Sequence, residues 1–337
     1  MSQVRVALVG ATGAVGRQML QLLEDRDFPV DELVCLADPR EEGTTVDFRG
    51  EKLTVKGASP AAFEGMDIVF LAVASEISQQ LAPEAVKRGC VAIDNSYAFR
   101  LHEEVPLVVP EVNAQDVKEH RGIIANPNCS TIIMVVAINP IHQAAGLKRV
   151  VVSTYQAVSG AGILGIDELT AQTRVALAGE EQPPEVFQYP IAFNLIPHID
   201  VFQENDYTKE EMKMVWETRK IMHLPELPIA ATTVRVPVYR SHSESINLDT
   251  EKKLTAEEAR QVLSQAPGIV VQDDPGAQVY PMPLYTSFKD EVYVGRIRED
   301  ISTEKGICIW VAADQIRKGA ATNAIQIAET VVKENLY

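Results

Sequence analysis

An N-terminal strand, a glycine-rich turn and a helix constrain the fold of this chain most. Val4 to Val9 is a short β-branched run of the kind found in buried parallel strands. Gly10, Gly13 and Gly16 follow it, and the helix-competent segment Arg17 to Arg26 comes next. In this setting glycines let the backbone approach a pyrophosphate at the helix N-terminus. The predicted dinucleotide-binding residues are Gly10, Thr12, Gly13, Ala14 and Val15.

The second predicted strand, Glu32 to Ala37, ends at the turn Asp38-Pro39-Arg40. A dinucleotide-binding fold places here the residue that reads the adenosine ribose. An acid such as Asp38 favours the free 2′-hydroxyl of NAD, whereas Arg40 favours the 2′-phosphate of NADP. The residues alone therefore leave the choice of cofactor open.

Strands and helices continue to alternate through the first third of the chain. The apolar runs Asp67 to Ala72 and Val91 to Asp94 read as buried strands, and the helical segment Ile77 to Arg88 separates them. Such alternation predicts a parallel sheet in an α/β domain. Arg100 ends the turn after the later strand, where it can reach a ligand at the sheet edge or lie exposed in a loop.

The motif Asn126-Pro127-Asn128-Cys129-Ser130-Thr131 joins a strand-like run, 122–125, to a helix-competent run, 131–145. A cysteine at a helix start is stabilised as a thiolate by the unpaired backbone N–H groups there, so its pKa falls. This placement predicts a nucleophile. The alternative is a buried, unreactive cysteine.

The middle of the chain has a different pattern, typical of a mixed sheet. Arg149 to Ala157 alternates like a strand and ends in a turn that contains Ser159 and Gly160, which can pass close to a cofactor. Gln156 lies just before that turn. Its amide could position a substrate oxygen or simply pair with neighbouring backbone.

Two further stretches carry candidate site residues. The predicted amphipathic helix Lys209 to Met222 bears Glu217 and Lys220 three residues apart. The alternative for this pair is a surface ion pair of little consequence. A β-rich run from Ile229 to Ser245 contains His242 with Arg235 and Arg240 nearby. An imidazole there could transfer protons, and a guanidinium could bind a carboxylate.

Composition excludes several classes of protein. A formal charge of −16 without a Lys/Arg-rich block argues against a nucleic-acid partner. Four scattered cysteines without C-x-x-C spacing argue against a zinc site or a disulfide framework and favour a reducing compartment. The absence of a leader and of a membrane-length apolar run leads us to expect a cytoplasmic protein with no membrane partner.

Four motifs in order, G-A-T-G-A-V-G, N-P-N-C-S-T, Y-Q-A-V-S-G-A-G and R-V-P-V-Y-R-S-H-S-E, extend over nearly the whole chain. Together they closely resemble the bacterial type of aspartate-β-semialdehyde dehydrogenase. The resemblance implies an N-terminal Rossmann-like domain, 1–128 with 317–337, and an α+β catalytic and dimerisation domain with a mixed sheet, 129–316. It also implies a homodimer or homotetramer.

The resemblance assigns a role to each matching residue. Cys129 would be the nucleophile, His242 the general acid/base, and Gln156 the residue that orients the substrate. Arg235 would bind the substrate carboxylate, with Glu217 near the amino group. The phosphate-binding residues would be Arg100, Asn128 and Lys220. The cofactor-binding residues outside the glycine loop would be Arg40, Ser159, Gly160 and Asn323, the last near the nicotinamide carboxamide.

The implied reaction is NADPH-dependent reductive dephosphorylation of β-aspartyl phosphate through a Cys129 thioester, in lysine, threonine, methionine and isoleucine biosynthesis. The family commonly has a small hydroxyl residue before the arginine, where this chain has Asp38 and Pro39. Two rivals are N-acetyl-γ-glutamyl-phosphate reductase and a non-catalytic dinucleotide-binding paralogue. The spacing of Arg235 and His242 together with Gln156 favours the aspartyl enzyme over the first, and the presence of both Cys129 and His242 disfavours the second.

Overall fold

A computed structural model describes residues 3–337, and the chain divides into two compact units. Unit 1 comprises Met1–Asn128 and Gly319–Tyr337, and unit 2 comprises Cys129–Lys318. The first boundary therefore lies immediately before the cysteine of the N-P-N-C-S-T motif. Among the described residues, no helix is long and apolar enough to cross a membrane.

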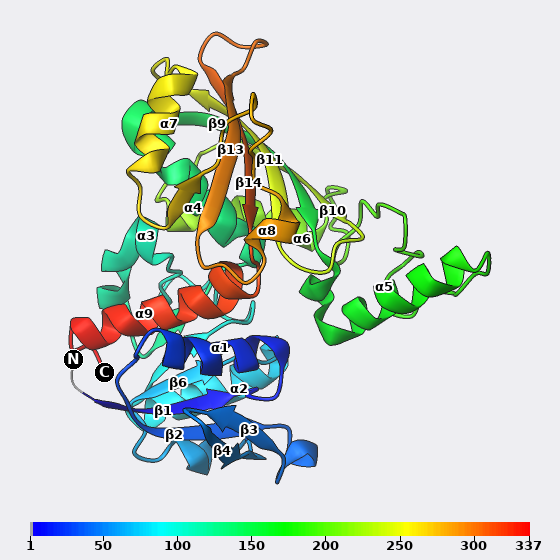
Figure 1. The fold of residues 1–337 in the computed structure, drawn as a ribbon. Coiled ribbons are helices and arrows are strands. Elements are labelled where there is room, and N and C mark those ends of the chain that lie inside the picture. The colour runs from blue at the N-terminus through cyan, green and yellow to red at the C-terminus, as the bar shows by residue number, and fades with distance from the viewer. Residues whose placement is uncertain (1–2) are drawn as a thin grey trace. The chain divides into compact units, whose positions relative to one another are not determined.

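Unit 1 is built on a parallel sheet of order β5-β2-β1-β6-β7-β8, with β1 near its centre (Figure 1). A separate antiparallel hairpin pairs β3 with β4. The strands are β1 (Val4–Val9), β2 (Val30–Ala37), β3 (Thr45–Phe48), β4 (Glu51–Thr54), β5 (Lys56–Gly57), β6 (Ile68–Leu71), β7 (Val91–Asp94) and β8 (Ile123–Ala125). The α-helices are α1 (Ala14–Asp25), α2 (Ser75–Lys87), α3 (Pro110–Asn113) and α9 (Thr322–Lys333), and the 3₁₀ helices are η1 (Pro39–Glu41), η2 (Pro60–Phe63) and η3 (Ala114–Glu119).

The C-terminal segment belongs to unit 1 because α9 completes its core. Ile325 and Val331 of α9 are fully buried in the same apolar cluster as Val6 and Leu8 of β1. One π-helical turn, η5 (Arg317–Ala321), precedes α9.

Unit 2 is built on a mixed sheet of order β10-β9-β11-β14-β13-β12. Helix α4 packs on its central strands and α6 packs on β10, so both cover the same face (Figure 1). The strands are β9 (Leu147–Gln156), β10 (Ile229–Arg235), β11 (His242–Thr250), β12 (Ile269–Val271), β13 (Val292–Glu299) and β14 (Gly306–Ala313). The helices are α4 (Cys129–Ala145), η4 (Val158–Ala161), α5 (Gly162–Leu177), α6 (Lys209–Ile221), α7 (Ala256–Ser264) and α8 (Pro283–Thr286).

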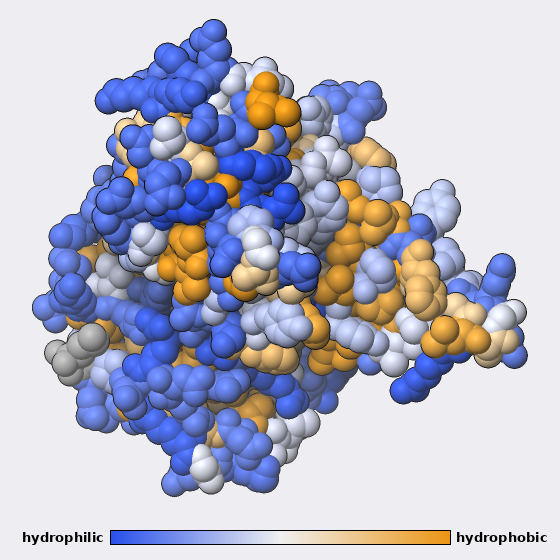
Figure 2. Space-filling model, turned by 45° about the horizontal axis from the view of Figure 1, so that its top comes forward, coloured by the Kyte–Doolittle hydropathy of each residue, from blue (hydrophilic) through white to orange (hydrophobic). Residues whose placement is uncertain are grey.

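Helix α5 extends from unit 2 as an arm that the sequence did not predict (Figure 1). Its surface and that of the segment after it are strongly apolar (Figure 2). Leu164 is 68% exposed and Phe193 is 71% exposed. Glu168 of α5 connects the helix to the segment after it, because its carboxylate accepts hydrogen bonds from the backbone N–H groups of Glu185 and Val186.

The predicted fold class is confirmed, with a parallel-sheet domain followed by a mixed-sheet domain. The main difference between the predicted and the observed strands concerns the β-rich run 229–245. It forms two strands, β10 and β11, separated by a turn in which Ser241 has φ = 74°. His242 is consequently the first residue of a strand, directly after a left-handed residue.

Gly16→Ala should destabilise unit 1. An ideal Cβ on Gly16 would lie 2.0 Å from the Gly10 carbonyl oxygen, so the turn would have to open. Overpacking of this kind costs about 1–3 kcal/mol, or several degrees in Tm. Gly13→Ala is the matched control, since its Cβ would lie 3.4 Å from that same oxygen. Equal Tm values for the two variants, measured by thermal unfolding, would contradict the close approach at Gly16.

Candidate active site

The glycine turn of unit 1 is shaped for close backbone approach and for an anion. Gly10 has φ = 88°, and a Cβ there would lie 2.3 Å from the Ala72 carbonyl oxygen. Helix α1 starts at Ala14 with no side-chain cap, and its first turn contains no acidic residue. Its N-terminal N–H groups therefore keep their partial positive charge for a ligand, which fits a dinucleotide pyrophosphate.

Asp38 and Arg40 form an ion pair with each other after β2. The Arg40 Nε and Nη2 atoms each donate to Asp38 over 2.8 Å, and the Arg40 backbone N–H donates over 2.9 Å. The guanidinium lowers the pKa of Asp38. The Asp38 carboxylate is occupied by this pairing, and the Arg40 side chain, 88% exposed, stays accessible to a ligand.

Arg100 and Asn323 support the segment that leads to the cysteine. Arg100 is buried and donates from Nε to the Asn126 carbonyl oxygen and from Nη2 to the Asn95 carbonyl oxygen, over 2.9 and 2.8 Å. Fully buried Asn323 donates to Val108 O and to Asn126 Oδ1. These contacts give Asn323 a structural function within unit 1, and its predicted position near the nicotinamide stays a prediction.

In unit 2, three predicted residues form one row across neighbouring strands of the covered sheet face. Arg235 at the end of β10 pairs in register with Gln156 at the end of β9. His242 begins β11, whose next residue pairs with the residue before Gln156. All three are buried. The sheet register thus brings together side chains that are 86 residues apart in the chain, from position 156 to position 242.

The guanidinium of Arg235 lies at the centre of the charges in this site. Its Nη1 atom donates to the Ala157 carbonyl oxygen over 2.7 Å. Burial lowers the pKa of Arg235, while the negative charges of Glu210 and Cys129 act in the opposite direction. A Cβ on Gly160 would lie 2.7 Å from Nη1, so only glycine leaves room for the guanidinium here. Cys129 is the first residue of α4, and its effect on the pKa of Arg235 shows that the two side chains are close enough for their charges to interact.

His242 is fully buried and its ring is held by the main chain. The backbone N–H of Ala157 donates to Nδ1 over 3.0 Å. Within the described residues Nε2 has no hydrogen-bond partner. Burial lowers the pKa of His242 well below its ordinary value, and the charge of Arg235 lowers it further.

The structure places a Glu–Lys pair beside the row that differs from the predicted one. Glu210, in the first turn of α6, accepts from Gln156 Nε2 over 3.3 Å and lies 3.1 Å from Lys213. Burial lowers the pKa of Lys213, but Glu210 and Asp200 outweigh burial and leave it raised. Sequence reasoning missed this pair, although it has the same spacing as the predicted pair, and the Thr208-x-x-Glu211 capping box could have marked the helix start.

The predicted pair, Glu217 and Lys220, lies about two turns farther along α6. Glu217 is completely buried. Burial lowers the pKa of Lys220, and the charge of Glu217 opposes that change. Their predicted contacts with the substrate ammonium group and with phosphate stay predictions.

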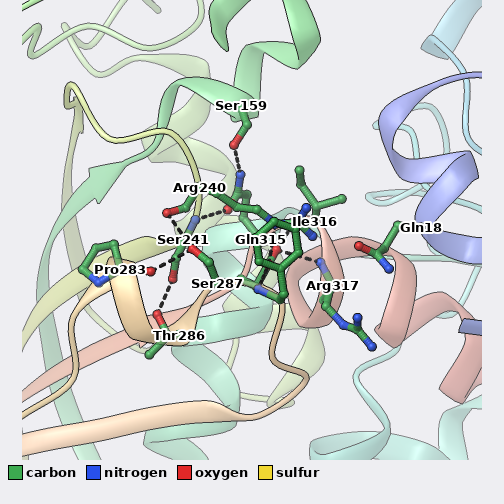
Figure 3. Close-up of polar contacts among 12 residues, drawn as sticks. Gln18, Ser159, Arg240, Ser241, Pro283, Thr286, Ser287, Gln315, Ile316 and Arg317 are labelled. Carbon is green, nitrogen blue, oxygen red and sulfur yellow. Dashed lines mark hydrogen bonds and ion pairs between the residues drawn. The ribbon is translucent and has the colours of Figure 1, made fainter. Parts of the chain in front are cut away.

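A polar network supports the turn before His242 and includes Gln315, a residue that sequence reasoning missed (Figure 3). The Gln315 side chain accepts the N–H of Ser241 over 2.8 Å and donates to the hydroxyl of Ser159. The Ser241 hydroxyl contacts that of Thr286 over 2.6 Å. Gln315 thus connects the Ser159–Gly160 turn to the left-handed residue before His242. No spacing or motif in the sequence indicated it.

Glu244 lies on the same face of β11 as His242, one row farther from the site. It pairs in register with Thr154 of β9 and Val311 of β14. Its side chain is completely buried, and both carboxyl oxygens lack a partner among the described residues. Burial raises the pKa of Glu244 well above its ordinary value and so favours the neutral acid.

Comparisons with known proteins agree with this architecture. The family model described as "Semialdehyde dehydrogenase, NAD binding domain" matches residues 5–120, and "Semialdehyde dehydrogenase, dimerisation domain" matches residues 138–318. Aspartate-semialdehyde dehydrogenase of Aquifex aeolicus is 56% identical over 98% of this chain and 99% of that protein. The Bacillus subtilis enzyme is 53% identical over 99% of both.

A solved structure is also similar over its whole length. The crystal structure of aspartate semialdehyde dehydrogenase II of Vibrio cholerae, "complexed with ASA", has a TM-score of 0.96 and 47% identity, and the match covers 99% of both chains. This likeness includes both units. The relatives therefore span the whole of this chain and are not confined to one of its domains.

Glu244→Gln should change how stability depends on pH. Because the pKa of Glu244 is higher in the folded state than in the unfolded state, the unfolded state releases its proton at lower pH. The protein therefore loses stability as pH rises from the unfolded-state pKa to the folded-state pKa. The Gln variant has no proton to release at this position, so its stability does not fall in this way. Its advantage in unfolding free energy should grow by about 1.4 kcal/mol per pH unit over that range. Denaturant titrations between pH 5 and 9 test this, with Glu51→Gln on the exposed β4 as control; a constant difference would contradict a neutral Glu244.

Proposed function

Because the chain belongs to the semialdehyde dehydrogenase family, we propose that it catalyses the reaction of its aspartate-semialdehyde dehydrogenase relatives. That reaction is the NADPH-dependent reductive dephosphorylation of β-aspartyl phosphate to aspartate β-semialdehyde, an intermediate in lysine, threonine, methionine and isoleucine biosynthesis. The observation that carries the proposal is the buried row of Arg235, Gln156 and His242 in a unit whose first residue is Cys129.

Cys129 is the nucleophile in this proposal. Its thiolate attacks the acyl phosphate, phosphate leaves, and a thioester remains, which splits one difficult reduction into two easier steps. The first turn of α4 contains no acidic residue, so the positive end of the helix favours the thiolate. The hydride that reduces the thioester would come from a reduced nicotinamide cofactor.

The buried row positions the substrate around that sulfur. Arg235 presents a planar guanidinium, which binds a carboxylate through two parallel hydrogen bonds. Gln156 orients the acyl group, and its amide is itself held by Thr154 and Glu210 over 3.3 Å each. His242 acts at the carbonyl oxygen, the position predicted for the acid–base group.

We assign Glu210 and Lys213 the roles that sequence reasoning gave to Glu217 and Lys220. Glu210 already contacts Gln156, so its carboxylate can accept the substrate's ammonium group. Lys213 lies beside it and can attract the phosphate. Arg100 and Asn128 of unit 1 stay predicted phosphate-binding residues.

Unit 1 would hold the cofactor, and we propose NADP. The turn Gly10–Val15 receives the pyrophosphate at the start of α1, and Ser159 and Gly160 of unit 2 remain the predicted contacts from that unit. Arg40, fixed by Asp38, offers a cation for the 2′-phosphate. Asp38 is engaged by that arginine and is therefore less suited to a ribose hydroxyl.

Unit 2 would also form a homodimer, as the description of its family model indicates. The exposed apolar residues of the α5 arm and the segment after it support a subunit contact, since patches of this kind mark interaction surfaces. Assembly beyond a dimer stays a prediction. Cys35, Cys90, Cys129 and Cys308 form no disulfide, which supports function in the reducing cytoplasm.

Cys129→Ala should abolish turnover, since no other thiol takes its place, and should leave the fold and NADP binding intact. The assay follows phosphate-dependent NADP reduction with aspartate semialdehyde, and the same assay with N-acetylglutamate semialdehyde tests the rival substrate in the unaltered protein. Substantial activity in the variant would refute the nucleophile. Faster turnover of the acetylated substrate would refute the aspartyl assignment.

Glu210→Gln should raise the KM for aspartate semialdehyde at least about tenfold, because it removes a charge-assisted hydrogen bond worth about 1.5–3 kcal/mol. Lys213→Met should raise the KM for phosphate similarly. The matched controls are Glu217→Gln and Lys220→Met on the same helix. Larger effects from the controls would return these roles to the pair that the sequence predicted.

A further inference from the structure

Unit 2 has a cavity on the face of its sheet that lies opposite to α4 and α6. The volume of the cavity is about 300 Å³, at the lower end of the range for ligand sites. Ser245 lines it, and strand alternation places Ser245 on the other face of β11 from His242 and Glu244. Trp310 of β14 pairs in register with Ser245 and lines the same cavity. The sheet therefore separates this cavity from the buried row.

The connection between β12 and β13 forms one wall of the cavity. Tyr280, Pro281 and Met282 of this connection line it. The indole Nε1 of Trp310 donates to the Pro281 carbonyl oxygen over 2.9 Å, which fixes the ring against the wall. Gly295 of β13 permits the approach, because a Cβ there would lie 2.5 Å from Cδ of Pro281. The wall is thus held in place by close contacts with the sheet.

A β-bulge in β13 brings two arginines to the same cavity. Between the register pairs Gly295–Trp310 and Arg298–Cys308, β13 has two residues and β14 has one. Regular alternation after Gly295 would place Arg296 on the face that α4 and α6 cover. Arg296 instead has φ = 50° and lines the cavity together with Arg298. The bulge has therefore turned the Arg296 side chain toward this site.

The two guanidinium groups are cations without an acidic partner. Among residues 3–337, neither Arg296 nor Arg298 forms an ion pair, although the chain has 47 acidic and only 31 basic side chains. Arg298 donates from Nη1 to the Arg296 carbonyl oxygen over 2.6 Å, which holds it beside the bulge. Two neighbouring cations repel each other, and a left-handed conformation is unfavourable for arginine. Both features oppose folding, and such strain is concentrated at ligand sites.

We propose that this cavity binds a small organic anion, which combines a planar apolar body with a carboxylate or phosphate group. The guanidinium groups of Arg296 and Arg298 bind the anionic group through paired N–H donors. The body packs against the rings of Trp310 and Tyr280, and the flexible side chain of Met282 adapts to its shape. The site is independent of the reaction proposed above, so either can fail without the other.

The fluorescence of Trp310 tests the proposal directly, because the chain has only two tryptophans. In Trp216→Phe, the remaining indole is the one that lines the cavity. The probes are phenylacetate and phenyl phosphate, and the controls are benzyl alcohol, which has the ring without the charge, and acetate, which has the charge without the ring.

We expect at least one anionic probe to cause a saturable change in fluorescence, with at least about tenfold weaker binding of both controls. The tighter of the two anionic probes identifies the preferred head group. Isothermal titration calorimetry on the unaltered protein repeats the measurement without the Trp216→Phe change. The proposal is overturned if neither anionic probe binds, or if benzyl alcohol or acetate binds as tightly as they do.

Variants of the two arginines test the anion-binding role. Arg296→Gln and Arg298→Gln should each weaken binding of the anionic probe at least about tenfold, because each removes a charge-assisted contact. The matched control is Arg149→Gln, which removes an exposed arginine of the same sheet that does not line the cavity. Equal weakening in the control would indicate general electrostatic attraction and contradict the site.

Arg296→Gly separates ligand binding from folding. Glycine adopts φ = 50° without strain, so this variant should lose binding at least about tenfold while its Tm stays equal or rises. A lower Tm would give the arginine a role in the fold and overturn the proposal. Light scattering on the same variants measures their assembly. A smaller assembly than that of the unaltered protein would assign the arginines to a subunit contact, which would also overturn it.

Discussion

The active site depends on a row of polar side chains buried on the covered face of the unit 2 sheet. Burying Arg235, Gln156 and His242 is costly unless each finds a partner. The main chain at Ala157 supplies two of these partners, since its carbonyl oxygen accepts from Arg235 and its N–H donates to His242. One residue at the end of β9 thus orients both side chains. Gln156, the residue before it, is held by Thr154 and Glu210.

Much of this arrangement could be predicted because it depends on local signals. At the N-terminus, a run of apolar strand residues is followed by regularly spaced glycines and a helix, a combination that few other folds use. Strand β1 has the predicted bounds. The start of α4 at Cys129 follows from the strand-like run and the turn residues before it. The register of β9, β10 and β11 could not be predicted, because side chains on three strands meet only through tertiary pairing.

Helix α6 carries two Glu–Lys pairs, and the sequence alone gives no ground for choosing between them. Glu210 and Lys213 have the same spacing as Glu217 and Lys220, so periodicity cannot separate them. Our proposal of Glu210 and Lys213 rests on the position of the helix relative to the sheet, since Glu210 in its first turn contacts Gln156. Gln315 and the left-handed Ser241 were missed for the same reason. Their importance comes from contacts with residues more than 40 positions away.

The site keeps its charges few and makes most of its polar groups neutral. Glu244 and His242 are both fully buried, and burial favours the uncharged form of each. Neutral donors keep their strength in a dry site without adding a charge that the thiolate would have to share. In the proposed reaction, Arg235 would act both on the Cys129 thiolate and on the substrate carboxylate. Because burial disfavours a charge on His242 and on Glu244, the proposed mechanism gives both tasks to the guanidinium of Arg235.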